Sequence, residues 1–120
     1  MARVLLLQFD TDPKCVPIRT ALEQVDAEIV EDEPRWPGFF QTVTRERPDT
    51  IIIACSKIPS HGREAARYLS EGFNTRNIPL ILVGVADRDL VKTREYAPRA
   101  QIVTAGDLAA AVSQRLQINV

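Results

Sequence analysis

Two carboxylates stand directly after the first apolar run of the sequence. Asp10 and Asp12 supply the oxygen ligands that a hard cation such as Mg²⁺ prefers. Asp12 also precedes Pro13, which is the arrangement of a helix cap followed by a proline in the first turn. Since two acids alone rarely complete a cation site, we interpret the pair as capping and loop residues, with a residual Mg²⁺ site as the alternative. No cofactor is therefore predicted.

Three further reactive side chains follow a later apolar run. Cys55 would need a neighbouring cation to act as a nucleophile, and Ser56 would need a base such as His61. We interpret Cys55, like Cys15, as a small buried apolar residue, and Ser56 as a hydroxyl that caps the loop backbone. His61 is expected to be a solvated residue near a helix start. A small enzyme or ligand-binding site built from these side chains and the two carboxylates is the alternative.

The composition narrows the class of protein. The 120 residues carry 15 Lys and Arg against 16 Asp and Glu, so no basic field is present to attract nucleic acid or an anionic membrane. Two cysteines and one histidine make neither a disulfide framework nor a set of metal ligands, and a reducing cytoplasm is the expected location. The length fits one domain, residues 1–120, and no apolar run is long enough to span a bilayer.

Five short runs rich in Val, Ile and Leu alternate with segments of helical spacing. Continuous apolar runs are typical of strands covered on both faces, and this alternation predicts a parallel α/β sheet. The predicted strands cover residues 4–9, 27–30, 50–54, 78–85 and 101–104. The predicted helices lie near residues 13–25, 37–46, 61–71, 87–97 and 104–116.

Local signals add detail at three connections. The acidic run 31–33 is expected to be a solvated loop. Gly72 and Asn74 are predicted to stop the third helix, and Phe73 follows the spacing of its apolar face. Thr104 and Asp107 have the spacing of a capping box at the start of the last helix.

The carboxyl ends of the strands are where an open parallel sheet binds its ligands. Neither a Gly-x-Gly-x-x-Gly fingerprint nor a Gly-Lys-Ser phosphate loop follows any predicted strand. The sequence therefore predicts that no dinucleotide or nucleoside triphosphate binds there.

Three motifs along the chain occur in the order and at the distances of one known family. Asp10 and Asp12 before Pro13 match an acidic strand end and a proline-started helix. Residues 48–53, Pro-Asp-Thr-Ile-Ile-Ile, match the lead into a phosphoacceptor. Residues 62–69, followed by residues 75–82, match a third helix and an Ile-Pro-led fourth strand. Over nearly its whole length the chain resembles the receiver domain of two-component response regulators. The resemblance implies a flavodoxin-like fold, a five-stranded parallel sheet in the order 2-1-3-4-5 with helices on both faces.

The receiver's catalytic positions carry other residues in this chain. The resemblance places the phosphoacceptor aspartate at Ala54, or at Cys55 in the neighbouring register, and neither side chain forms an acyl phosphate. The hydroxyl residue that ends the fourth strand falls on Gly84 and the lysine that ends the fifth falls on Ala105. The switching aromatic of the fifth strand falls on Ile102. The resemblance thus implies the fold of a receiver without its phosphotransfer chemistry.

These observations predict a stand-alone pseudo-receiver that acts as a signalling protein-interaction module and not as an enzyme. The expected partner is a signalling protein or a second copy of the chain. A phosphoreceiver that uses Ser56 as an unconventional acceptor is a further alternative. In phosphorylatable receivers the segment that matches residues 87–101 often mediates contacts, and Trp36 serves either packing or a partner surface. The candidate surface residues are Trp36, Arg88, Lys92, Arg94 and Arg99.

Overall fold

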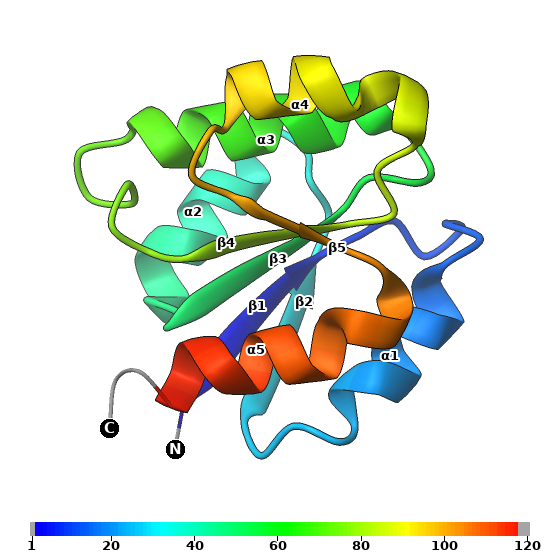
Figure 1. Ribbon diagram of the computed structural model, residues 1–120. Coiled ribbons are helices and arrows are strands. Elements are labelled where there is room, and N and C mark those ends of the chain that lie inside the picture. Colours follow the sequence, from blue (N-terminus) through cyan, green and yellow to red (C-terminus); the bar gives the residue numbers. More distant parts are fainter. Residues whose placement is uncertain (1, 118–120) are drawn as a thin grey trace.

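The computed structural model describes residues 2–117, which form a five-stranded parallel sheet with helices on both faces (Figure 1). The strands are β1 (Arg3–Leu7), β2 (Glu28–Asp32), β3 (Thr50–Ala54), β4 (Leu80–Val83) and β5 (Gln101–Val103). They lie in the order β2-β1-β3-β4-β5, and each neighbouring pair is parallel. The flavodoxin-like topology predicted from the sequence is confirmed.

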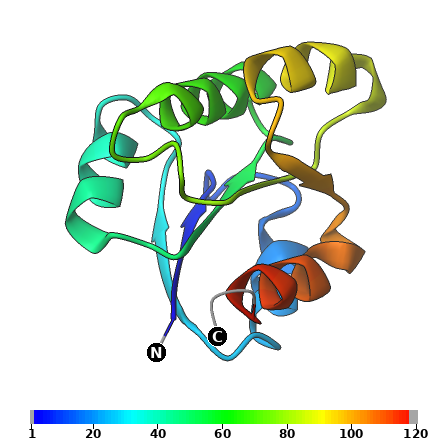
Figure 2. The same ribbon diagram turned by 60° about the vertical axis from the view of Figure 1, so that its left-hand side comes forward.

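Helices cover the sheet in two layers. They are α1 (Cys15–Leu22), α2 (Gly38–Glu46), α3 (Pro59–Glu71), α4 (Leu90–Tyr96) and α5 (Leu108–Gln117). Two 3₁₀ turns, η1 (Asp87–Asp89) and η2 (Ala105–Asp107), lead into α4 and α5. Helices α2, α3 and α4 lie on one face of the sheet, and α1 and α5 lie on the other (Figure 2). Within residues 2–117, no helix is both long and apolar enough to cross a membrane.

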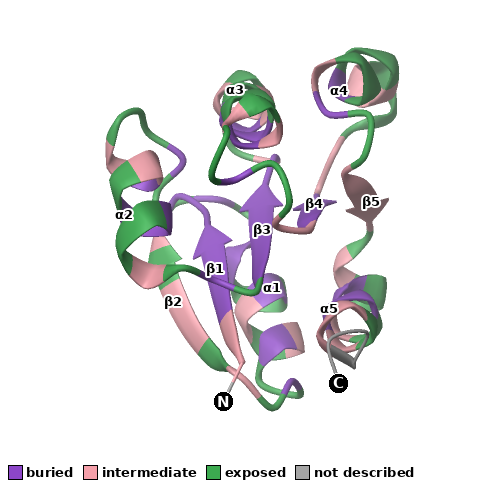
Figure 3. Cartoon of the chain, turned by 90° about the vertical axis from the view of Figure 1, so that its left-hand side faces the viewer, coloured by how far each residue is buried: buried purple, intermediate pink, exposed green. Residues whose placement is uncertain are grey.

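The side chains of β3 alternate between two apolar cores. Ile51 and Ile53 pack with Phe39 of α2 and Leu69 of α3 on one face of the sheet. Ile52 faces the opposite side and packs against the layer formed by α1 and α5. Figure 3 shows that burial is concentrated on β1, β3 and β4, whereas the edge strands β2 and β5 are half-buried. The continuous apolar runs in the sequence therefore result from strands with two covered faces.

Polar bonds fasten β1 to β3 at the amino end of the pair. The backbone N–H of Arg3 donates to Asp49 Oδ2 at 2.8 Å, and the backbone N–H of Asp49 donates to the Arg3 carbonyl at 2.8 Å. Along the pair, Leu7 lies opposite Ile53. This register brings the carboxyl ends of β1 and β3 level, so the loops that follow them lie next to each other.

Of the acidic run 31–33, only Glu33 lies in an exposed loop, and the prediction is wrong for Glu31 and Asp32. Glu31 and Asp32 are the last two residues of β2. Arg19 donates to Glu31 at 2.9 Å, and the Thr42 hydroxyl donates to the Asp32 carboxylate. Since partners on α1 and α2 compensate both acids, the edge strand extends further than its apolar residues indicate.

Helix α3 ends at Glu71 with Gly72 as its C-cap residue, as the sequence predicts, but the placement of Phe73 differs from the prediction. Gly72 adopts an extended conformation, with φ −68° and ψ 136°, and not the left-handed turn that favours glycine. The chain therefore leaves the helix axis after Glu71, and Phe73 is 80% exposed instead of lying on the apolar face. The Thr75 hydroxyl donates to the Leu69 carbonyl at 2.8 Å and satisfies the helix end.

Candidate functional site

Three small residues occupy the carboxyl ends of β3, β4 and β5. Ala54 is the last residue of β3, is buried, and lies opposite Val83 of β4. Gly84 directly follows β4, and Ala105 opens the η2 turn after β5. Gly84 and Ala105 line one cavity of about 320 Å³. At the edge where an open sheet places its ligand, none of these three residues supplies a nucleophile, a hydroxyl or a cation.

Asp12 is a buried carboxylate that joins two loops. It is 2% exposed, and its two oxygens accept from different backbone groups. Oδ1 accepts from the N–H of Lys14 at 2.7 Å, and Oδ2 accepts from the N–H of Lys57 at 3.0 Å. Helix α1 begins at Cys15. Asp12 therefore stabilises the turn before α1 and links this turn to the loop after β3 through hydrogen bonds. It does not serve as the predicted cap residue of the helix.

Asp10 points away from this buried link. Its side chain is 88% exposed and forms an ion pair with Arg19 at 2.9 Å. Hydrogen bonds from Arg19 to Glu31, and then to Asp10, raise the pKa of the guanidinium above its usual range. The two acids predicted as a possible cation pair thus have separate partners. Across residues 2–117, no three His, Cys, Asp or Glu side chains are grouped so that they could hold a metal ion.

Ser56 fills the space beside Gly84. Gly84 has φ +81°, and a Cβ built on it would meet Ser56 Oγ. Ser56 Oγ is shielded from solvent and has no hydrogen-bond partner among the described residues. The predicted role of Ser56 as a loop-capping hydroxyl is therefore wrong. A hydroxyl that solvent does not reach is also poorly placed to attack a phosphodonor.

Cys55 is buried at the end of β3, as the sequence predicts. Burial raises the pKa of its thiol to about 12, because the thiolate would lose its hydration. Its sulfur packs against Gly62 of α3, where a Cβ would lie only 2.7 Å from Sγ. Cys55 is therefore a packing residue with almost no thiolate at neutral pH. Cys15 is likewise buried, and its thiol donates to the Asp10 carbonyl at 3.4 Å.

His61 and Lys14 lie at different sides of this end of the sheet. The ring of His61 packs 5.8 Å from the ring of Phe9, and its Nδ1 is buried without a hydrogen-bond partner in the described chain. His61 is therefore half-buried, and the predicted solvation of its ring is only partial. Lys14 lines the cavity that Gly84 and Ala105 share. The sequence gives no sign of this placement, because Lys14 precedes α1 and is distant from β4 and β5 along the chain.

An aromatic surface lies between the start of α2 and the middle of α3, and Trp36 is its centre. The indole stacks on the ring of Tyr68 with centroids 4.6 Å apart, and it contacts Phe39 and Phe40 at 5.7 and 5.6 Å. Trp36 remains 56% exposed and Tyr68 46% exposed. A cavity of about 400 Å³ lies beside them. Trp36 therefore takes part in packing and in an exposed surface, and Tyr68 is the member that sequence reasoning missed.

The charged surface candidates lie on and around α4. Arg88, Lys92 and Arg94 are exposed on η1 and α4, and Arg99 is exposed in the connection to β5. Ile102 of β5 is half-buried and packs against the core beneath the α2, α3 and α4 layer. The structure thus separates two candidate surfaces, the aromatic one around Trp36 and the charged one on α4.

Comparison with known proteins identifies the fold. The sequence matches no family model and no curated protein. A signal receiver domain of a signal transduction histidine kinase from Syntrophus aciditrophicus matches with a TM-score of 0.74 and 23% identity, over 98% of this chain and 91% of that one. A response regulator from Hahella chejuensis matches with a TM-score of 0.77 and 16% identity, over 100% and 98% of the two chains.

The isolated REC domain of RcsB from Salmonella enterica serovar Typhimurium is similar as well. Its TM-score is 0.71 at 17% identity, over 99% of this chain and 90% of that one. All three are receiver domains or response regulators, so the chain has the receiver fold that its motifs predicted. At these identities the likeness establishes the fold alone, and the chemistry has to be argued from the residues of this chain.

Proposed function

We propose that this receiver-fold domain is not phosphorylated and works by binding another protein. The observation that carries the proposal is the presence of Ala54, Gly84 and Ala105 where the receivers it resembles have an aspartate, a hydroxyl and a lysine. Phosphoryl transfer depends on a positioned acceptor and on cations that neutralise the developing charge. Ala54, Gly84 and Ala105 supply neither, so the fold is retained without the reaction.

The polar groups that lie near these positions support the same conclusion. Both oxygens of Asp12 already accept backbone N–H groups, so binding a cation there would compete with the bonds that hold two loops together. Ser56 Oγ is enclosed beside Gly84. Neither residue is placed to replace the missing acceptor or its metal.

The aromatic surface around Trp36 supports the binding role. Tryptophan, tyrosine and arginine dominate the energetics of protein interfaces, and Arg35 lies next to the exposed Trp36 and Tyr68. The net charge of −1 favours a protein partner over nucleic acid or an anionic membrane. The proposed partner is a signalling protein in the cytoplasm or a second copy of the chain. The exposed face of α4 is the second candidate surface.

Incubation of the full chain with acetyl phosphate and Mg²⁺ is expected to leave its intact mass unchanged. The reason is that Ala54, Gly84 and Ala105 cannot accept or stabilise the phosphoryl group as an aspartate, a hydroxyl residue and a lysine would. Mass spectrometry measures the result, and a phosphorylatable receiver treated in parallel shows that the donor is active. A stable adduct of one phosphoryl group would contradict the proposal. If Ser56→Ala then abolished the adduct, Ser56 would be the acceptor.

Replacement of Trp36 by alanine is expected to weaken partner binding by more than about tenfold, the usual effect of removing an interface tryptophan. The immobilised chain captures its partner from the cytoplasm of the source cells, and biolayer interferometry on the purified partner compares wild type with Trp36→Ala. Val16→Ala is the matched control, because Val16 is exposed on α1 at the other face of the sheet.

Three outcomes would argue against this assignment. Equal binding by wild type, Trp36→Ala and Val16→Ala would exclude the aromatic surface. Loss of binding in Lys92→Ala or Arg94→Ala alone would move the interface to α4. If no protein is captured and sedimentation shows a monomer, the interaction role itself fails. Circular dichroism of each variant verifies that the fold is retained.

A further inference from the structure

Arginines border one small cavity at the amino ends of β4 and β5, the end of the sheet opposite to Ala54. The cavity measures about 200 Å³. Its lining comes from α3, from the segment that leads into β4, from the segment that leads into β5, and from α5. The polar lining residues are Ser70, Arg76, Asn77, Arg99 and Arg115, and no Asp or Glu of the described part of the chain lines the cavity.

Two of these arginines lack the counter-charge that most arginines in the chain have. Arg76 and Arg99 form no ion pair with any residue in the range 2–117, and the guanidinium of Arg76 instead lies over the ring of Phe73 at 5.3 Å. Ion pairs with carboxylates hold Arg3, Arg19, Arg35, Arg45, Arg63, Arg67 and Arg88. Two like charges beside one cavity repel each other, and a bound anion would relieve that repulsion.

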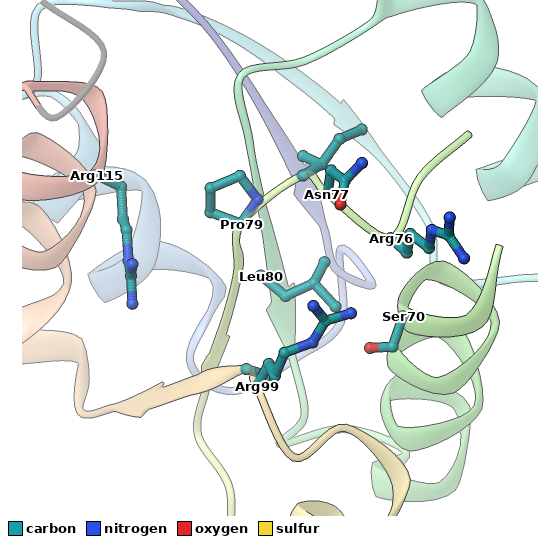
Figure 4. Close-up of a pocket in the computed structure, with 9 residues that line it drawn as sticks. Ser70, Arg76, Asn77, Pro79, Leu80, Arg99 and Arg115 are labelled. Atoms are coloured by element: carbon teal, nitrogen blue, oxygen red, sulfur yellow. The ribbon is translucent and has the colours of Figure 1, made fainter. Parts of the chain in front are cut away.

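The polar groups around the cavity are well suited to an anion. Figure 4 shows Arg99 extending past Leu80 toward Ser70 of α3. Arg76 lies to one side, next to Asn77, and Arg115 lies on the other side of Pro79. Arg115 Nε donates to Gln101 Oε1 at 3.2 Å, which orients this side chain from α5. Guanidinium, amide and hydroxyl groups all donate hydrogen bonds, and guanidinium groups have no acceptor.

We propose that this cavity binds the phosphate group of a phosphate monoester, with Arg99 as its central ligand. The planar guanidinium fork matches two phosphate oxygens, and a phosphate charge of about −1.5 to −2 matches two uncompensated arginines better than a single carboxylate does. The volume is below the roughly 300 Å³ at which pockets for drug-sized ligands begin, so a compact group fits best. The site is separate from the proposed interaction surface around Trp36 and does not depend on that function.

Two sources can supply this chemistry, a phosphorylated side chain of a protein and a small phosphorylated metabolite. Inorganic phosphate is the first probe, titrated into the full ¹⁵N-labelled chain at pH 7.5 and constant ionic strength. Saturable amide shifts are expected at Ser70, Asn77 and Ala100, with none when chloride replaces phosphate. A phosphoserine peptide, its unphosphorylated form and glucose 6-phosphate follow, and the tighter of the two phosphate compounds identifies the source.

Variants of exposed arginines test the assignment. Arg99→Gln is expected to weaken phosphate binding by about tenfold, and Arg99→Lys by less, because lysine keeps the charge and loses the fork. Arg45→Gln removes the same charge from α2, which packs on β1 and β2 towards the opposite edge of the sheet, and is expected to change affinity less than about twofold. Equal effects of Arg99→Gln and Arg45→Gln, or the absence of saturable shifts with every phosphate compound, would overturn the proposal.

Discussion

Substitution of Gly84 by alanine is expected to lower the free energy of unfolding by about 2 kcal/mol. The backbone at Gly84 has φ +81°, a conformation that residues with a Cβ rarely adopt. An added Cβ would also meet the shielded Ser56 Oγ, so the loop after β3 would have to move. Urea unfolding followed by the fluorescence of Trp36, the single tryptophan, measures the change.

Gly38 provides the matched control for this substitution. It opens α2, and a Cβ built on it meets no atom within 4 Å, so Gly38→Ala is expected to leave stability unchanged or to raise it by about 0.5 kcal/mol. Ser56→Ala separates the two causes, because without the hydroxyl Gly84→Ala is expected to cost about 1 kcal/mol less. Equal effects at Gly84 and Gly38 would show that the backbone at Gly84 is not constrained.

Replacement of Asp12 by alanine is expected to cost about 3 kcal/mol of folding stability. The substitution leaves the N–H groups of Lys14 and Lys57 without their acceptor, and each unsatisfied donor costs about 1–3 kcal/mol where water cannot replace the bond. Asp12→Asn keeps one acceptor oxygen, so it is expected to lose roughly half as much. The same urea titration measures both variants.

Asp10 is the natural comparison for Asp12. It lies two residues away, but its carboxylate is exposed and, among residues 2–117, bonds only to Arg19 at the surface. Asp10→Ala is therefore expected to change the free energy of unfolding by less than about 1 kcal/mol. If Asp10→Ala and Asp12→Ala lowered stability equally, the link between the two loops would not contribute to the fold.

The layout of the sheet could be predicted because its signals are local and agree with one another. The continuous apolar runs that became β1, β3 and β4 each read as a strand covered on both faces, and the helices between them require parallel crossovers. The positions of Ala54, Gly84 and Ala105 at the strand ends could be predicted as well, since they are found by counting along the chain.

Other features depend on contacts between distant segments, and no sequence pattern reports them. The length of β2 is set by Arg19 and Thr42, which compensate Glu31 and Asp32 from two different helices. The stacking of Trp36 on Tyr68 joins two segments that are separated by most of α2, β3 and α3. A tyrosine on an exposed helix position reads as an ordinary surface residue until its neighbour is known.

Geometry also corrected roles that residue type alone had assigned. Asp12 was expected to cap a helix, yet it accepts from a loop 45 residues away. The cavity beside Arg99 is formed by α3, α5 and the segments that lead into β4 and β5. The sequence alone therefore does not show that its arginines lie close together. The type of a polar residue indicates which groups it can bind, and the fold determines which of these groups lie within its reach.

The polar bonds at the two ends of the β1 and β3 pair determine the register in which these two strands align. In a strand with one solvent-exposed face, a shift of the register by one residue would expose apolar side chains to water. The hydrophobic pattern alone therefore disfavours such a shift. Here both faces of β1 and β3 are apolar, so a slipped pair would bury nearly the same kinds of side chain. The bonds of Arg3 to Asp49 at one end and of Asp12 to Lys57 at the other hold only in one alignment. The carboxylates of Asp49 and Asp12, at the two ends of the pair, thus select the observed register. The apolar side chains between them would pack almost equally well in another register.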